Sequence, residues 1–172
     1  MEDRPPSLTS CTTDSAQFGF VSTAQSNSFT QDAMLLPSDP DEVYAFGRNL
    51  YFGYSSWPDH KRGKILILRA ATMGSVVAEG KCYFEGWKRQ KDLRKAVKLY
   101  KEAALKGNAD GQHHLGYCYI EGMGIEKNCK DGVSWYERAS AQGHPGALCN
   151  LALCYQSGQG TQKDHKKAIQ LL

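Results

Sequence analysis

The chain has 172 residues, of which 41% are hydrophobic and 23% charged, and its formal net charge is +3 at pH 7. This composition is typical of a globular protein with room for one domain core. Proteins that bind nucleic acid usually carry a larger or more segregated basic excess, so the composition argues against that class. The longest aliphatic run, Ile65–Leu68, is far shorter than the roughly 18 apolar residues that span a membrane, which argues against membrane insertion.

Residues 1–37 differ in composition from the rest of the chain. They are rich in Ser, Thr, Gln and Pro, and such a segment buries too little apolar surface to offset its ordering entropy. The first residues lack the basic and apolar regions of a secretory signal, and Glu2 and Asp3 are unlike a mitochondrial presequence. We therefore expect a disordered leader over 1–37 and a folded domain over 38–172. The default location is cytoplasmic, and a nuclear location is also compatible.

The folded part repeats one pattern around a glycine. The glycines lie 33, 36 and 36 residues apart: Gly53, Gly86, Gly122 and Gly158. Seven residues before each is a small residue: Gly47, Gly80, Gly116 and Ala152. Three residues before each is a large one: Leu50, Tyr83, Tyr119 and Tyr155. Six residues after each is a helix-capping type: Asp59, Asp92, Asn128 and Asp164.

Each unit predicts two helices. The first ends at the glycine, which can adopt the left-handed conformation of a helix C-terminus, and the second begins at the Asp or Asn cap. The second helix is clearest over Asp92–Gly107, where apolar residues recur at the spacing of one helical face. The shorter first step predicts a first helix about one turn shorter in the unit that contains Gly80.

The pattern resembles the Sel-one-like repeat, a relative of the tetratricopeptide repeat. The match is closest in the third unit, at Leu115-Gly116, Tyr119, Gly122, Gly124, Lys127-Asn128, Trp135-Tyr136 and Gly143-His144. The resemblance implies an all-α, right-handed α/α solenoid of about three and a half helix-turn-helix repeats. The units are predicted at about 40–73, 74–106, 107–142 and 143–172, the last incomplete. Members of this family act as scaffolds and adaptors, which implies a non-catalytic protein–protein interaction scaffold.

Chemical sites are weakly indicated. Cys82, Cys118 and Cys154 recur 36 residues apart, so we interpret them as small packing residues rather than catalytic thiols. His114 and Cys118 have a spacing that can supply two metal ligands, and Cys118 with Cys129 is a candidate redox pair, but no further short-spaced ligand pair accompanies them. GxSxG, phosphate-loop and HExxH motifs do not occur in the sequence. We interpret the chain as having no enzymatic activity, cofactor or metal.

Two surfaces are candidates for binding a protein partner. Arg94, Lys98 and Lys101 share the helix face opposite the apolar stripe, which suits an acidic segment. The resemblance also implies a concave groove lined by the first helices, which suits an extended peptide. The non-core positions of this groove are predicted to be Lys81, His113, Tyr117 and Gln156.

Two other functions are compatible with the sequence. One is a redox-active or cofactor-assembly protein that uses its cysteines, and the other is the regulatory repeat arm of a larger enzyme. The sequence also stops inside a second helix, whereas solenoids need a polar terminal unit. We therefore expect the end to be covered by further sequence, by a partner or by self-association with a second copy.

Overall fold

The computed structural model describes residues 37–54, 58–87 and 90–171, and every regular element in these ranges is a helix. The helices are α2 (Pro40–Phe52), α3 (His60–Met73), α4 (Val76–Glu85), α5 (Leu93–Leu105), α6 (Ala109–Glu121), α7 (Cys129–Ala141), α8 (Pro145–Ser157) and α9 (His165–Gln170). Among the described residues, no helix is both long and apolar enough to cross a membrane. Apart from Pro37, the leader expected over 1–37 lies outside the described residues.

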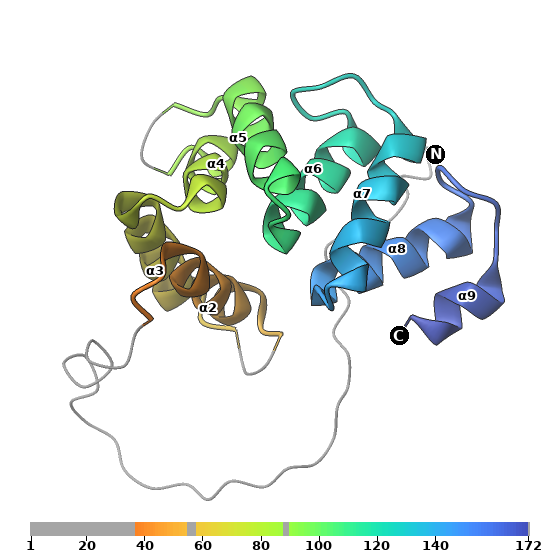
Figure 1. The fold of residues 1–172 in the computed structure, drawn as a ribbon, viewed down its shortest axis with the longest axis horizontal. Helices are drawn as coiled ribbons and strands as arrows, with labels where there is room; N and C mark the ends of the chain where they lie inside the picture. Colours follow the sequence, from red (N-terminus) through yellow and green to blue (C-terminus); the bar gives the residue numbers. More distant parts are fainter. Residues whose placement is uncertain (1–36, 55–57, 88–89, 172) are drawn as a thin grey trace, which may run out of the picture.

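The helices follow one another in a curved row, from α2 and α3 to α8 and α9 (Figure 1). Each packs mainly against its neighbours in the sequence, so α2 pairs with α3, α4 with α5, α6 with α7, and α8 with α9. This arrangement confirms the all-α solenoid. The boundaries drawn between units at 73, 106 and 142 remain a prediction from the sequence period.

The repeated glycines and caps mark the helix ends in the structure. Gly53, Gly86, Gly122 and Gly158 each follow a first helix and take the left-handed conformation, with φ between 71° and 76°. Side-chain oxygens of Asp59, Asp92, Asn128 and Asp164 each accept a hydrogen bond from a backbone N–H in the first turn of the second helix. The first helix α4 has 10 residues, whereas α6 and α8 have 13 each, which confirms the predicted shortening by about one turn.

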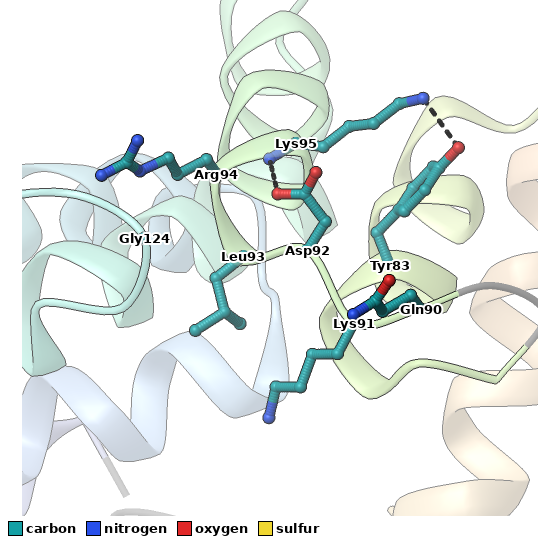
Figure 2. Close-up of a pocket in the computed structure, with 8 residues that line it drawn as sticks. All are labelled: Tyr83, Gln90, Lys91, Asp92, Leu93, Arg94, Lys95 and Gly124. Atoms are coloured by element: carbon teal, nitrogen blue, oxygen red, sulfur yellow. Dashed lines mark hydrogen bonds between the residues drawn. The ribbon is translucent and has the colours of Figure 1, made fainter.

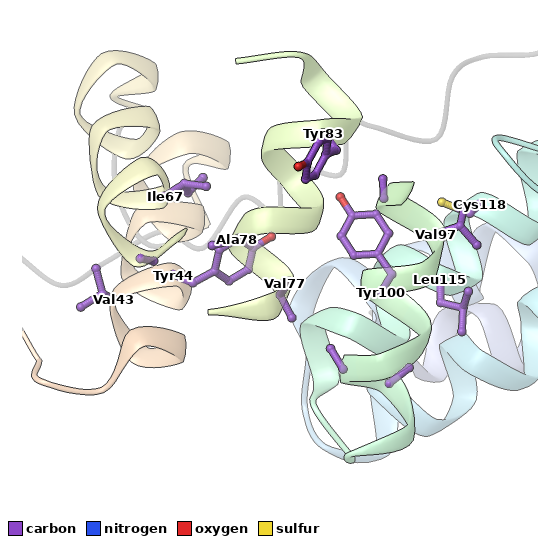
Figure 3. Close-up of a cluster of buried hydrophobic side chains, with 14 of the residues drawn as sticks. Val43, Tyr44, Ile67, Val77, Ala78, Tyr83, Val97, Tyr100, Leu115 and Cys118 are labelled. Carbon is purple, nitrogen blue, oxygen red and sulfur yellow. The ribbon is translucent and has the colours of Figure 1, made fainter. Parts of the chain in front are cut away.

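The core depends on close approach between glycine and tyrosine. Tyr100 and Tyr136 are fully buried, and each ring lies against the backbone of the preceding first helix (Figure 3 shows Tyr100 in this core). A Cβ at Gly80 would lie 2.7 Å from Cε1 of Tyr100, and one at Gly116 would lie 2.8 Å from Cδ1 of Tyr136. Any side chain at these two positions would therefore have to displace a buried ring.

We expect Gly116→Ala to lower the free energy of unfolding by about 1–2 kcal/mol, because overpacking a core outweighs the gain in helix propensity. The added methyl would also lie 3.0 Å from the carbonyl oxygen of Gly132, which is backbone and cannot rotate away. Urea unfolding followed by circular dichroism measures the change. Ser134→Ala, at an exposed position of α7, is the matched control and should leave stability nearly unchanged. An unchanged midpoint for Gly116→Ala would contradict the close-approach interpretation.

Candidate functional site

A buried polar cluster joins α2 to α6 and α8, which are distant in the sequence. This inner cluster consists of Tyr44, Arg48, Asp110, His113, His114, His144 and Asn150. Arg48 donates a hydrogen bond to Oδ1 of Asp110, and these two residues are only 8% and 9% exposed. Nδ1 of His144 accepts from the backbone N–H of Ala147, so its Nε2 carries the proton and donates to Asp110 at 3.1 Å. Asp110 thus holds both an α2 and an α8 side chain.

The two adjacent histidines of α6 take different partners. The ring of His113 stacks on that of His144 with centroids 4.5 Å apart, and Asn150 donates to its Nε2 at 3.1 Å. The ring of His114 stacks on Tyr100 at 4.8 Å, and its Nε2 shares a 2.6 Å hydrogen bond with Tyr44. His114 is therefore occupied inside the protein, whereas His113 is half-buried and its Nδ1 has no hydrogen-bond partner among the described residues.

The surroundings of the inner cluster set its charges. Burial opposes ionisation of Asp110, but the hydrogen bond from His144 and the Arg48 guanidinium outweigh it and lower the pKa of this carboxyl. Burial lowers the pKa of His113 and of His114 well below the usual range, and neighbouring cations act in the same direction. The two histidines are therefore neutral in the folded protein at neutral pH, while Arg48 and Asp110 are charged.

Stability should fall in mild acid because of these histidines. Their folded pKa values lie below the ordinary value of about 6.5, so the unfolded chain binds more protons, and stability is lost as the pH falls below that value. We expect the free energy of unfolding to drop by roughly 1–3 kcal/mol between pH 7.5 and 5.5, measured from urea midpoints.

The double variant His113→Asn, His114→Gln should flatten this pH dependence, whatever its effect on stability at neutral pH. His165→Gln, at an exposed position of α9, is the control and should leave the slope as it is. If stability depended on pH as steeply in the double variant as in the unmodified protein, the pH dependence would not come from the two histidines of α6.

The predicted groove residues do not share one open surface. Lys81 is buried at 6% exposure, donates to Oε1 of Glu85 at 2.6 Å, and has its Nζ within 6.0 Å of four aromatic ring centroids, those of Tyr51, Phe52, Phe84 and Trp87. His113 belongs to the inner cluster. Tyr117 is half-buried, with its ring centroid 6.2 Å from that of Phe84, and Gln156 is exposed on α8.

The basic residues of α5, unlike the groove residues Lys81 and His113, are accessible on the surface. Arg94, Lys98 and Lys101 are exposed, and none has a carboxylate within ion-pair distance in the part of the chain that the structure describes. Beside Arg94, at the start of α5, lies a depression of about 840 Å³ (Figure 2). It is lined by Tyr83, Gln90, Lys91, Asp92, Leu93, Arg94, Lys95 and Gly124.

Thiol chemistry has little support in the structure. No cysteine among the described residues forms a disulfide, and Cys82, Cys118 and Cys154 are buried. Burial raises the pKa of Cys118 and of Cys154 to about 12, so neither is a thiolate at neutral pH. Within the described ranges, no three His, Cys, Asp or Glu side chains are grouped as a metal site would require.

Sequence reasoning missed most of the inner cluster. Arg48, Asp110 and Asn150 belong to no motif, and their partners come from other units, so periodicity could not indicate them. The available signal was a departure from the repeat. Asp110 carries a charged side chain, whereas the equivalent position in the next unit, 36 residues later, is Gly146.

The geometry defines a helical repeat protein, and comparison with known proteins identifies which kind. The Sel1 repeat matches residues 77–108, 109–144 and 145–172, so the chain belongs to the Sel1 repeat family. No curated protein matches the chain.

Two solved structures have the same fold. A Sel1 repeat protein from Oxalobacter formigenes is 30% identical with a TM-score of 0.52, and the match covers 83% of this chain and 59% of that one. The second is c5321, described as a protective antigen of uropathogenic Escherichia coli with an SLR fold. It is 28% identical with a TM-score of 0.55, and the match covers 82% of this chain and 30% of that one. The chain thus spans less than two thirds of either protein.

Proposed function

We propose that this protein is a non-catalytic interaction scaffold that binds an acidic segment of a partner protein along the outer face of α5. The observation that carries the proposal is the exposed row of Arg94, Lys98 and Lys101, none of which forms an ion pair with a described residue, since the nearby Glu102 is bound to Lys106. At 1.5 Å rise per residue, these three positions span about 10 Å of the helix. Several carboxylates of one short segment can therefore bind to it at once.

Comparison with α7 supports a specific role for this face. The positions 36 residues later are Lys130, Ser134 and Glu137, so the basic row is not part of the repeat framework. The exposed face of a helix needs no net charge to fold, and three unpaired cations repel one another weakly. The basic row of α5 is not required by the fold and is absent from the next unit. Both facts support a role in binding.

The groove is the weaker candidate. A peptide that contacted the Lys81 ammonium would have to displace the aromatic rings around it, and Nε2 of His113 already accepts from Asn150. The outer face of α5 requires no such exchange.

Charge reversal of the α5 face tests the proposal. We expect the triple variant Arg94→Glu, Lys98→Glu, Lys101→Glu to weaken binding of a fluorescein-labelled oligoglutamate peptide by at least about tenfold, since each reversed charge removes an attraction and adds a repulsion. Fluorescence anisotropy measures the affinity, and binding by the unmodified protein should weaken with added salt. A labelled single-stranded oligonucleotide serves as the competing ligand class.

The matched control is Lys127→Glu, Lys130→Glu, Lys166→Glu, which changes the net charge equally at exposed positions elsewhere. It should retain most of the affinity. If both triple variants lost the same affinity for the peptide, the loss would come from net charge, and the specific role of the α5 face would be contradicted. Tighter binding of the oligonucleotide than of the peptide would overturn the proposed partner class.

A further inference from the structure

The depression at the start of α5 is built by two consecutive units. Tyr83 comes from the end of α4, residues 90–92 precede α5, residues 93–95 form its first turn, and Gly124 comes from the loop between α6 and α7. Gly124 has a φ of +72° and lies directly against the backbone carbonyl of Leu93, so no side chain fills this side of the depression. Figure 2 shows these groups around the opening.

The next unit builds the same framework with different charges. Gly160, with a φ of +75°, lies against the carbonyl of Cys129 as Gly124 lies against that of Leu93. The depression at α5 has three cations, Lys91, Arg94 and Lys95, against one carboxylate, Asp92. The positions 36 residues later hold two cations and two carboxylates: Glu126, Lys127, Lys130 and Asp131. The framework belongs to the repeat, whereas the positive charge belongs to this copy.

The cations of the depression are spread rather than convergent. Lys95 donates from Nζ to the Tyr83 hydroxyl at 2.7 Å, while Lys91 and Arg94 point in other directions (Figure 2). The backbone N–H of Lys95 is bound by the Asp92 carboxylate, which caps α5 and repels a dianion at the helix N-terminus. Separated single cations match separated single carboxylates better than one phosphate group, which prefers convergent donors.

We propose that this depression anchors an acidic side chain of the partner segment, one that is next to the carboxylates bound along α5. The inference rests on the proposed function, because Arg94 lies at the edge of the depression and also begins the basic row. One carboxylate of the bound segment then lies at the depression lined by residues 90–95, and neighbouring carboxylates lie at Lys98 and Lys101. Lys91 and Lys95 supply the charge, Lys95 being held over the buried Tyr83 ring, and Leu93 supplies the apolar contact for the methylene groups of the anchoring side chain.

Exchanging the charges of the two depressions tests the inference. The variant Gln90→Glu, Lys95→Asp gives the α5 depression the residues that the next unit already has, so it is expected to fold. We expect it to weaken binding of the labelled oligoglutamate peptide about five- to tenfold. The reciprocal variant Glu126→Gln, Asp131→Lys is a control. Because Ser134 and Glu137 leave α7 without the basic row, it should leave the peptide stoichiometry measured by isothermal titration calorimetry unchanged.

A separate variant distinguishes this inference from the proposed function. Lys98→Glu, Lys101→Glu changes the α5 face without touching the depression. If this variant loses affinity and the Gln90, Lys95 exchange does not, the anchor is overturned and the α5 face stands. If neither loses affinity, both are overturned. Stronger competition by inorganic phosphate than by acetate at equal ionic strength would also overturn a carboxylate anchor.

Discussion

The fold depends on how closely two successive helices can approach. At Gly80 and Gly116 the first helix of a unit presents bare backbone, and a tyrosine of the second helix fills the space that a side chain would occupy. The ring is fully buried in both units, so the contact adds a large apolar area to the core while shortening the distance between helix axes. The caps, the left-handed glycines and the loops all follow from keeping this pairing in register. The surfaces that face solvent are free of that constraint.

The contrast between the repeated helix contacts and the unconstrained surfaces explains what could be predicted from the sequence. The helices and their ends follow from local rules that recur in every copy, the packing role of Cys118 follows from its recurrence at Cys82 and Cys154, and the short α4 follows from the one shorter step in the period. The exposure of Arg94, Lys98 and Lys101 follows from the same periodicity. Long side chains that cross between units follow no such rule. Lys81 was predicted to line an open groove, but its burial results from four aromatic rings contributed by two helix pairs and their loops, and the sequence pattern of one unit contains no information on these.

The histidine pair of α6 illustrates the same limit. The sequence indicated His114 as a possible metal ligand and His113 as a groove residue, and the structure shows that both rings contact other helix pairs of the protein. His114 packs on Tyr100 and bonds to Tyr44, and His113 packs on His144, so the two adjacent side chains connect the third helix pair to the second, the first and the fourth. A position that differs from its repeat equivalents can therefore serve contacts inside the protein as readily as contacts with a ligand, and only the three-dimensional neighbours tell which.

The inner cluster also affects how cooperatively the helix pairs unfold. In an ideal solenoid each repeat contacts only the next, so stability is a sum of local terms and the units can unfold one after another. The bonds from Arg48 to Asp110 and from Tyr44 to His114 pass over the second helix pair and connect the first to the third. Opening the first pair therefore leaves a charge and several polar groups of the third pair without partners in a buried setting. The first three helix pairs should consequently unfold as one cooperative unit. The array resists extension along its axis and does not unfold one pair at a time from the first pair.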